Sequence, residues 1–204
     1  MRRTQAREAN RRALLGAASA LIAREGTAVR LEAIADAAGL TTGAIYSIFG
    51  SKNDLMVAVL ADEISRIDLS IHPEYDPALP LNAVIDRYVQ TWLATYSGYS
   101  KAQTAFEFQL LLSALENEEL QGRLAEMLDA EIGQLARLLE NRLIDPARPS
   151  DRTTPEQGAA IAKAMKAILT GFGLRQPFMA DVSDLARQSC LALTALARTP
   201  PHTG

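Results

Sequence analysis

Residues 39–52 read GLTTGAIYSIFGSK, and this stretch decides how the N-terminal part of the chain folds. Gly39 and Gly50 bracket it, and glycine is the residue that most often terminates a helix. Thr41 can cap a new helix, because its hydroxyl accepts a hydrogen bond from a free backbone amide of the first turn. The sequence therefore predicts a short helix from Thr41 to about Phe49, with a turn on either side.

A second short helix is predicted immediately before this stretch, over residues 31–38. Its apolar residues Leu31, Ile34, Ala35 and Ala38 recur at three- and four-residue steps, so they share one face. Helix, glycine-containing turn, helix is the arrangement of a helix-turn-helix, whose second helix enters the DNA major groove. The pattern therefore favours a DNA-binding unit at this end of the chain.

The outward positions of the second helix are small or polar, which suits a close approach to DNA. They are Thr41, Thr42, Gly43, Ala44 and Ser47. Hydroxyl groups can contact a base or a phosphate, and the methyl groups of Thr42 and Ala44 suit the thymine methyl. A tyrosine hydroxyl, that of Tyr46, can reach a backbone phosphate. The alternative is a three-helix cap that binds no DNA.

Charge is distributed unevenly along the chain. Residues 1–52 hold eight Lys and Arg against four Asp and Glu, a net charge of +4. The remainder holds thirteen against twenty, a net charge of −7. A basic end on an acidic body indicates that one segment meets a polyanion, although a small basic excess is also an ordinary solvated surface.

Helical periodicity continues through the rest of the chain, and strand signals are nearly absent. Apolar residues between Ala6 and Leu21 form one stripe that Gly26 ends. Thr154, with Pro155 and a glutamine two residues later, has the pattern of a capped helix start. We expect an all-α fold of nine helices, of which the last six cover about residues 52–69, 81–97, 101–116, 118–144, 155–174 and 182–198.

Composition argues against several other classes of protein. Cys190 is the only cysteine, which excludes an intramolecular disulfide and fits a reducing compartment. His72 and His202 are the only histidines, so we expect neither a zinc site nor a cofactor. No apolar run of about 18 residues marks a membrane span and no secretory signal is visible, so we expect a cytoplasmic protein. No nucleotide-binding loop or hydrolase motif is present, and we expect no enzyme.

Residues 31–55, LEAIADAAGLTTGAIYSIFGSKNDL, resemble the DNA-binding signature of the tetracycline-repressor-like (TetR) family of bacterial transcription regulators. The matching features keep a fixed spacing, and they are Ile34-Ala35, Ala38-Gly39, Gly43, Ile45-Tyr46, Phe49, Ser51-Lys52 and Leu55. The resemblance covers roughly residues 10–60. Residues 114–128 faintly resemble part of the regulatory domain of many members.

The resemblance implies a ligand-responsive transcription repressor. It implies an Ω-shaped homodimer of all-helical subunits, in which residues 1–52 bind a palindromic operator in double-stranded DNA. Residues 53–204 would then form the effector-binding and dimerisation domain, and a small-molecule effector would release the DNA. The alternative function is that of an all-α ligand-binding or scaffold protein without DNA binding.

Site residues carry over from the family position by position. The phosphate contacts of the family fall on Tyr46 and Lys52, and the base-reading positions fall on Thr42, Ala44 and Ser47. We therefore expect these five residues to lie against DNA.

Two positions depart from the family pattern. Arg30 stands where members usually have a capping Ser or Thr, and it can hold a phosphate although it cannot cap the helix. Ile48 stands where many members have a histidine, which removes one polar contact. The contacts of this chain with DNA should therefore differ from those of its relatives near these two residues.

Large aromatic residues concentrate outside the DNA-binding segment. If the later helices form a bundle, five apolar side chains could line a pocket for an aromatic or lipophilic molecule. They are Trp92, Tyr96, Phe106, Met127 and Phe172. Each of them could equally be an ordinary core residue.

The last two helices carry small and apolar faces. Such faces suit close packing between subunits, as in a two-fold four-helix interface. A single chain could bury them instead, and the family resemblance favours the homodimer.

Overall fold

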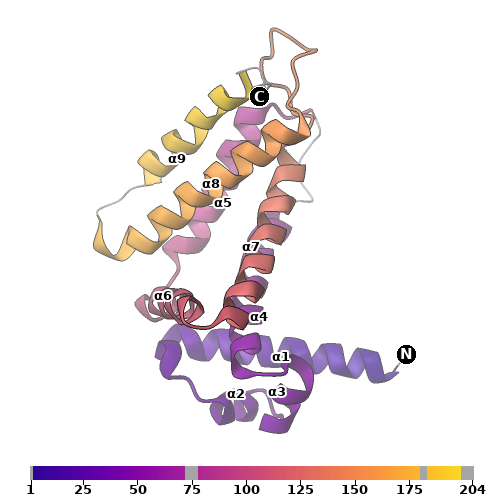
Figure 1. Cartoon of the computed structure of the whole chain (residues 1–204), viewed down its shortest axis with the longest axis vertical. Coiled ribbons are helices and arrows are strands. Elements are labelled where there is room, and N and C mark those ends of the chain that lie inside the picture. Colours follow the sequence, from indigo (N-terminus) through magenta and orange to yellow (C-terminus); the bar gives the residue numbers. More distant parts are fainter. Residues whose placement is uncertain (1, 72–77, 180–182, 199–204) are drawn as a thin grey trace. The chain divides into compact units, whose positions relative to one another are not determined.

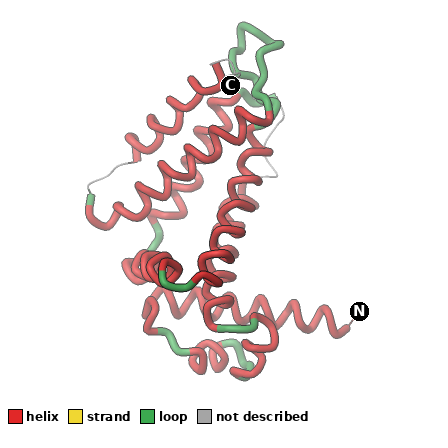
Figure 2. Tube along the Cα trace, in the orientation of Figure 1, coloured by secondary structure: helices red, strands yellow, loops and turns green. Residues whose placement is uncertain are grey.

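The computed structural model describes residues 2–71, 78–179 and 183–198, and these ranges are almost entirely helical (Figures 1 and 2). The α-helices are α1 (Arg2–Glu25), α2 (Leu31–Ala37), α3 (Thr42–Phe49), α4 (Lys52–Ile71), α5 (Leu81–Ser97), α6 (Lys101–Leu115), α7 (Glu118–Leu139), α8 (Pro155–Arg175) and α9 (Ser183–Ala192). Short 3₁₀ helices are η1 (Gly26–Ala28), η3 (Gln176–Phe178) and η4 (Leu193–Arg198). The described ranges contain nine α-helices and no strand, which confirms the predicted all-α fold.

Helices begin where the sequence predicts caps. The Thr41 hydroxyl accepts a hydrogen bond from the Ala44 amide at 3.3 Å. At α8, the Thr154 hydroxyl accepts from the Gln157 amide, and the Gln157 side chain accepts from the Thr154 amide. Each cap satisfies backbone amides that a helix leaves without partners, so these local signals fix the helix starts.

Two helices end earlier than their apolar periodicity predicts. The helix predicted over 118–144 stops at Leu139, because the Thr153 hydroxyl donates to the Leu139 carbonyl and Asn141 takes a left-handed φ of 56°. An isolated antiparallel bridge then joins Leu143 to Arg152. The last helix, predicted to residue 198, gives way to η4 after Ala192.

The chain forms two compact units that do not follow sequence order. The first contains Met1–Ile64 and Tyr99–Met127, and the second contains Ser65–Gly98 and Leu128–Gly204. Helices α4 and α7 each contribute residues to both units. These units describe packing, and the functional boundary at residue 52 stays a prediction.

In the first unit, α1 packs against α2, α3, η1 and α6. The core includes the fully buried Leu14, Ile34, Ile45 and Leu55. Burial of one such side chain stabilises the fold by about 1.5–3 kcal/mol, so a few of them hold the short helices α2 and α3 against α1.

In the second unit, α5 packs against α9, and α8 packs against α9 and η4 (Figure 1). Its core includes the fully buried Ile85, Leu139, Ile161 and Leu169, together with Cys190. None of the helices that the structure describes is long and apolar enough to span a membrane.

Candidate nucleic-acid interface and effector-site residues

The turn between α2 and α3 has the hydrogen bonds of a Schellman motif. The Leu40 amide donates to the Ala35 carbonyl at 2.9 Å, and the Gly39 amide donates to the Asp36 carbonyl at 3.0 Å. Gly39 has a φ of +66°, while a Cβ atom added there would meet nothing within 4 Å. The glycine therefore serves the left-handed backbone of the turn and not a close approach of helices.

Helix α3 is anchored on one side and exposed on the other. Ile45 is fully buried, whereas Tyr46 is 53% exposed. Thr41, Gly43 and Ser47 are also exposed, and Thr42 and Ala44 are half-buried. The predicted DNA-facing positions of α3 thus lie on the accessible side of a helix whose apolar side is fixed in the core.

Arg30 lies at the N-cap position of α2 and is exposed. Its side chain makes no capping hydrogen bond to the helix. The departure from a capping Ser or Thr therefore leaves a cation beside the N-terminal end of α2, where partial positive charge also favours an anion.

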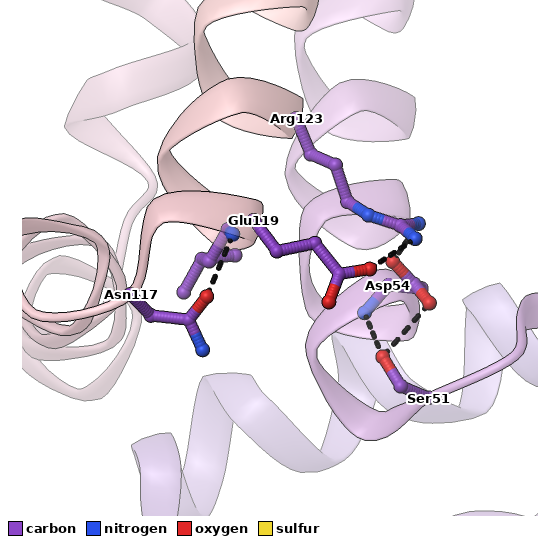
Figure 3. A network of polar contacts seen from close by, with 6 residues as sticks. Ser51, Asp54, Asn117, Glu119 and Arg123 are labelled. Atoms are coloured by element: carbon purple, nitrogen blue, oxygen red, sulfur yellow. Dashed lines mark hydrogen bonds and ion pairs between the residues drawn. The ribbon is translucent and has the colours of Figure 1, made fainter.

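The turn between α3 and α4 is held by a polar network (Figure 3). Gly50 has a φ of +92°, and the Ser51 hydroxyl donates to Asp54 Oδ2 at 2.8 Å. The Asp54 amide donates back to the Ser51 hydroxyl at 3.1 Å, which completes the predicted start of α4. Arg123 of α7 forms ion pairs with Asp54 and Glu119. A residue far along the chain therefore fixes the turn that follows α3.

Lys52 is the first residue of α4, directly after this turn, and its side chain contacts the protein itself. Its Nζ donates to the Val29 carbonyl oxygen at 3.2 Å. An ammonium group has three donors, so two remain for other acceptors. The proposed phosphate contact and this internal hydrogen bond are compatible.

Two arginines of α1, which sequence reasoning did not place in the site, contact α3. Arg7 Nη2 lies 3.5 Å from the Ser47 carbonyl oxygen, and the guanidinium of Arg11 lies 5.7 Å from the centre of the Phe49 ring. Residues four apart on a helix lie on one face, so the spacing of Arg7 and Arg11 could have predicted that both point to the same neighbouring helix.

Of the predicted pocket residues, Trp92 and Tyr96 lie together in the second unit. Their rings stack with centroids 4.0 Å apart. Gly173 of α8 faces both, since a Cβ atom added there would lie 3.1 Å from atoms of each ring. Phe172 is half-buried on the same helix.

The other two predicted pocket residues belong to the first unit. Phe106 is buried in its core, and Met127 packs against that core while half-buried. The five residues therefore divide between the two units, and their membership of one pocket stays a prediction.

A buried polar cluster in the second unit was missed. Lys166 of α8 forms an ion pair with Glu131 of α7, and its Nζ donates to the Tyr88 hydroxyl at 3.2 Å. Glu131 is 5% exposed. The sequence held one signal of this cluster. Glu131 lies seven residues after Leu124 and four before Leu135, so its carboxylate interrupts the apolar face of α7.

Cys190 is buried, and burial raises the pKa of its thiol to about 11. A thiol with a raised pKa is a poor nucleophile, because the thiolate is the reactive form. His72, its conceivable partner in thiol chemistry, and His202 lie outside the described residues.

Residues 14–59 match the family model of the bacterial regulatory proteins of the tetR family. No curated protein matches the sequence. Among solved structures, the chain is similar to a TetR transcription regulator from Haloarcula marismortui, with a TM-score of 0.68 and 18% identity over 91% of this chain and 96% of that one.

The chain is similar to two further solved structures of regulators. The chain is similar to the TetR family repressor AlkX from Dietzia sp., implicated in biodegradation of n-alkanes, with a TM-score of 0.63 and 18% identity over 92% of this chain and 95% of that one. It is also similar to the fatty acid degradation regulator FadR from Bacillus halodurans, with a TM-score of 0.59 and 18% identity over 90% of this chain and 94% of that one. At these identities the likeness establishes the fold.

Proposed function

We propose that this chain, whose residues 14–59 match the family model of the bacterial regulatory proteins of the tetR family, is a DNA-binding transcription regulator that represses transcription as a homodimer on a palindromic operator and that a small lipophilic or aromatic effector releases it. The observation that carries the DNA-binding part is the two-sided character of α3. Its buried Ile45 fixes the helix, while Thr41, Tyr46 and Ser47 face solvent. A rigid helix with exposed hydroxyl groups is suited to the major groove.

Selection of binding sites from a random duplex library tests this proposal. We expect enrichment of a palindrome, with half-site centres separated by about one DNA turn, roughly 34–36 Å, or a multiple of it. Enrichment of an unsymmetrical site would contradict the homodimer, and no enrichment would favour the alternative of a helical ligand-binding or scaffold protein. A reporter gene placed behind the selected site would then distinguish repression from activation.

Homodimerisation is proposed through α8 and the segment from α9 to η4. Leu185 and Leu196 in this segment are 53% and 43% exposed, and α8 carries exposed small residues. Apolar side chains on such helices favour association with a second copy. Light scattering at micromolar concentration measures the mass, for which twice 22.1 kDa is expected.

The proposed effector class rests on the stacked rings of Trp92 and Tyr96. Two similar structures are those of a repressor implicated in n-alkane biodegradation and of a fatty acid degradation regulator, which agrees with apolar effectors. Trp92 is the only tryptophan, so its fluorescence reports from one place. We expect a compound that releases DNA to change this emission. Release without any change in Trp92 emission would count against Trp92 as a pocket residue.

A further inference from the structure

We propose that the first turns of α1 form a second DNA-binding site, where Thr4, Arg7 and Asn10 hold a backbone phosphate beside the recognition helix. This inference rests on the proposed function, since it assigns part of the DNA to a surface outside the helix-turn-helix. The occupant is the sugar–phosphate backbone of double-stranded DNA.

The site is a groove of about 610 Å³ within the first unit. Its lining residues are Thr4, Ala6, Arg7 and Asn10 of α1 and Ala44, Ser47 and Ile48 of α3. Two of them, Ala44 and Ser47, are predicted to read bases. The groove is therefore continuous with the proposed DNA-reading face of α3.

The chemistry of the lining suits an anion. Thr4, Arg7 and Asn10 together supply a hydroxyl, a guanidinium and an amide, and none of the described residues that line the groove carries a carboxylate. Thr4 and Arg7 are exposed. These groups are the ones with which proteins contact phosphate oxygens.

The guanidinium of Arg7 is directed by α3. It lies 3.5 Å from the carbonyl oxygen of Ser47, one of the last four of α3 and hence without a partner in a continuing helix. A guanidinium has five N–H donors, so this contact leaves several for a phosphate. The nearest acid along α1, Glu8, lies within 4.0 Å of Arg12 and so is partly neutralised.

A phosphate fits this position better than a base. An α-helix that reads base edges fills much of the DNA major groove, so the two sugar–phosphate backbones of the DNA lie next to the flanks of that helix. The groove of the protein lies on such a flank of α3, between that helix and α1. Ile48 lines the same groove of the protein. It stands where many relatives have a histidine, so the position that lacks a polar side chain lies next to the donors of α1.

The test is the salt dependence of DNA binding for Arg7→Gln in the full chain. Each phosphate contact contributes about 0.9 to the slope of log affinity against log salt concentration. We expect Arg7→Gln to lower the slope by about this amount, on the selected operator and on an unrelated duplex alike, with the preferred sequence unchanged. Arg7→Lys should keep the slope of the wild type. Arg24→Gln is the matched control, because Arg24 is an exposed cation at the other end of α1 and should leave the slope unchanged.

An unchanged slope for Arg7→Gln would overturn the inference. A changed sequence preference with an unchanged slope would also overturn it, because it would show that Arg7 only positions α3 through Ser47. Circular dichroism and thermal unfolding of each variant verify the fold. If the wild type selects no sequence but Arg7→Gln still lowers the slope on any duplex, the proposed function fails and the phosphate site stands.

Discussion

Lys52 lies on the surface, yet its ammonium group donates a hydrogen bond to the Val29 carbonyl oxygen. Thr41 likewise caps α3 with its hydroxyl oxygen, whose hydrogen remains available to a phosphate. At the scale of single residues, the proposed DNA contacts therefore also shape the domain. Substitutions of Lys52 and Thr41 should therefore change the free energy of unfolding as well as DNA binding, and the two effects can be measured separately.

Lys52→Ala should affect both properties. Loss of one hydrogen bond lowers the free energy of unfolding by about 1 kcal/mol. Loss of one phosphate contact lowers the salt slope of DNA binding by about 0.9. Urea unfolding and binding titrations at several salt concentrations measure the two effects, and Lys52→Arg is the control that keeps the charge. An unchanged slope would leave Lys52 with its internal role alone.

Thr41 and Thr42 are adjacent and should behave differently. Thr41→Ala removes the helix cap and should destabilise the protein by about 1 kcal/mol, whereas Thr41→Ser should keep most of that stability. Thr42→Ala removes no described cap, so its effect should be on the bases preferred in a site selection. A selection profile for Thr42→Ala identical to that of the wild type would show that Thr42 reads no base.

The sequence predicts contacts between residues that are close along the chain better than contacts between distant residues. The cap at Thr41 and the turn at Gly39 depend on neighbours within five residues, so residue type alone indicates them. The contact from Lys52 to Val29 spans 23 residues, and that from Arg7 to Ser47 spans 40. Such contacts depend on how helices pack, which the local pattern does not specify.

At the scale of elements, the turn between α3 and α4 depends on α7. Arg123 pairs with Asp54, whose side chain is 10% exposed, and Asp54 in turn holds Ser51 (Figure 3). Removal of Arg123 would leave a largely buried carboxylate without its cation, which is unfavourable. The ion pair therefore helps to fix where α4 begins and where α3 ends.

Arg123→Ala should lower the melting temperature of the wild type more than that of the Asp54→Asn variant, because the amide carries no charge to leave unpaired. A thermal double-mutant cycle measures this difference. Arg123→Ala should also weaken operator binding, since the Gly50–Asp54 turn loses its support. Equal losses in both backgrounds would show that the two side chains are not coupled.

Helix α8 offers a matched pair of glycines. A Cβ atom at Gly173 would lie 3.1 Å from ring atoms of Trp92 and Tyr96, while one at Gly171 would meet nothing within 4 Å. Gly173→Ala should destabilise the protein by about 1–3 kcal/mol through overpacking, and it should shift Trp92 emission. Gly171→Ala should stabilise it by about 1 kcal/mol through helix propensity. Similar effects of both substitutions would refute the close contact.

Element ends were less predictable than element starts. Caps mark a start within three residues, whereas the end of α7 at Leu139 depends on Thr153, which lies fourteen residues later. The apolar stripe alone continues to residue 144. A helix that is stopped by a distant hydroxyl leaves no local signal of its end.

At the scale of the whole molecule, the predicted pocket shows the limit of composition. The concentration of aromatic residues predicted that Phe106 and Trp92 line one pocket. Phe106, however, is buried in the core of the first unit, and Trp92 is buried in the core of the second. The polar cluster of Glu131, Lys166 and Tyr88 comes from three helices. Only the topology brings such residues together, so the helix-turn-helix of α2 and α3 was more predictable than the proposed effector site.

The proposed release of DNA has a consequence that is independent of the effector's identity. If an effector weakens operator binding by roughly 100-fold, the operator must weaken effector binding by the same factor, about 2.8 kcal/mol, because the two ligands share one thermodynamic cycle. Trp92 emission, titrated with a releasing compound in the presence and absence of saturating operator, measures the second factor. An unrelated duplex at the same salt concentration is the control and should have a smaller effect. Effector affinity that is unchanged by operator would mean that the compound acts on the DNA and not through a site on the protein, because any ligand of the protein that weakens operator binding must itself bind less tightly in the presence of operator.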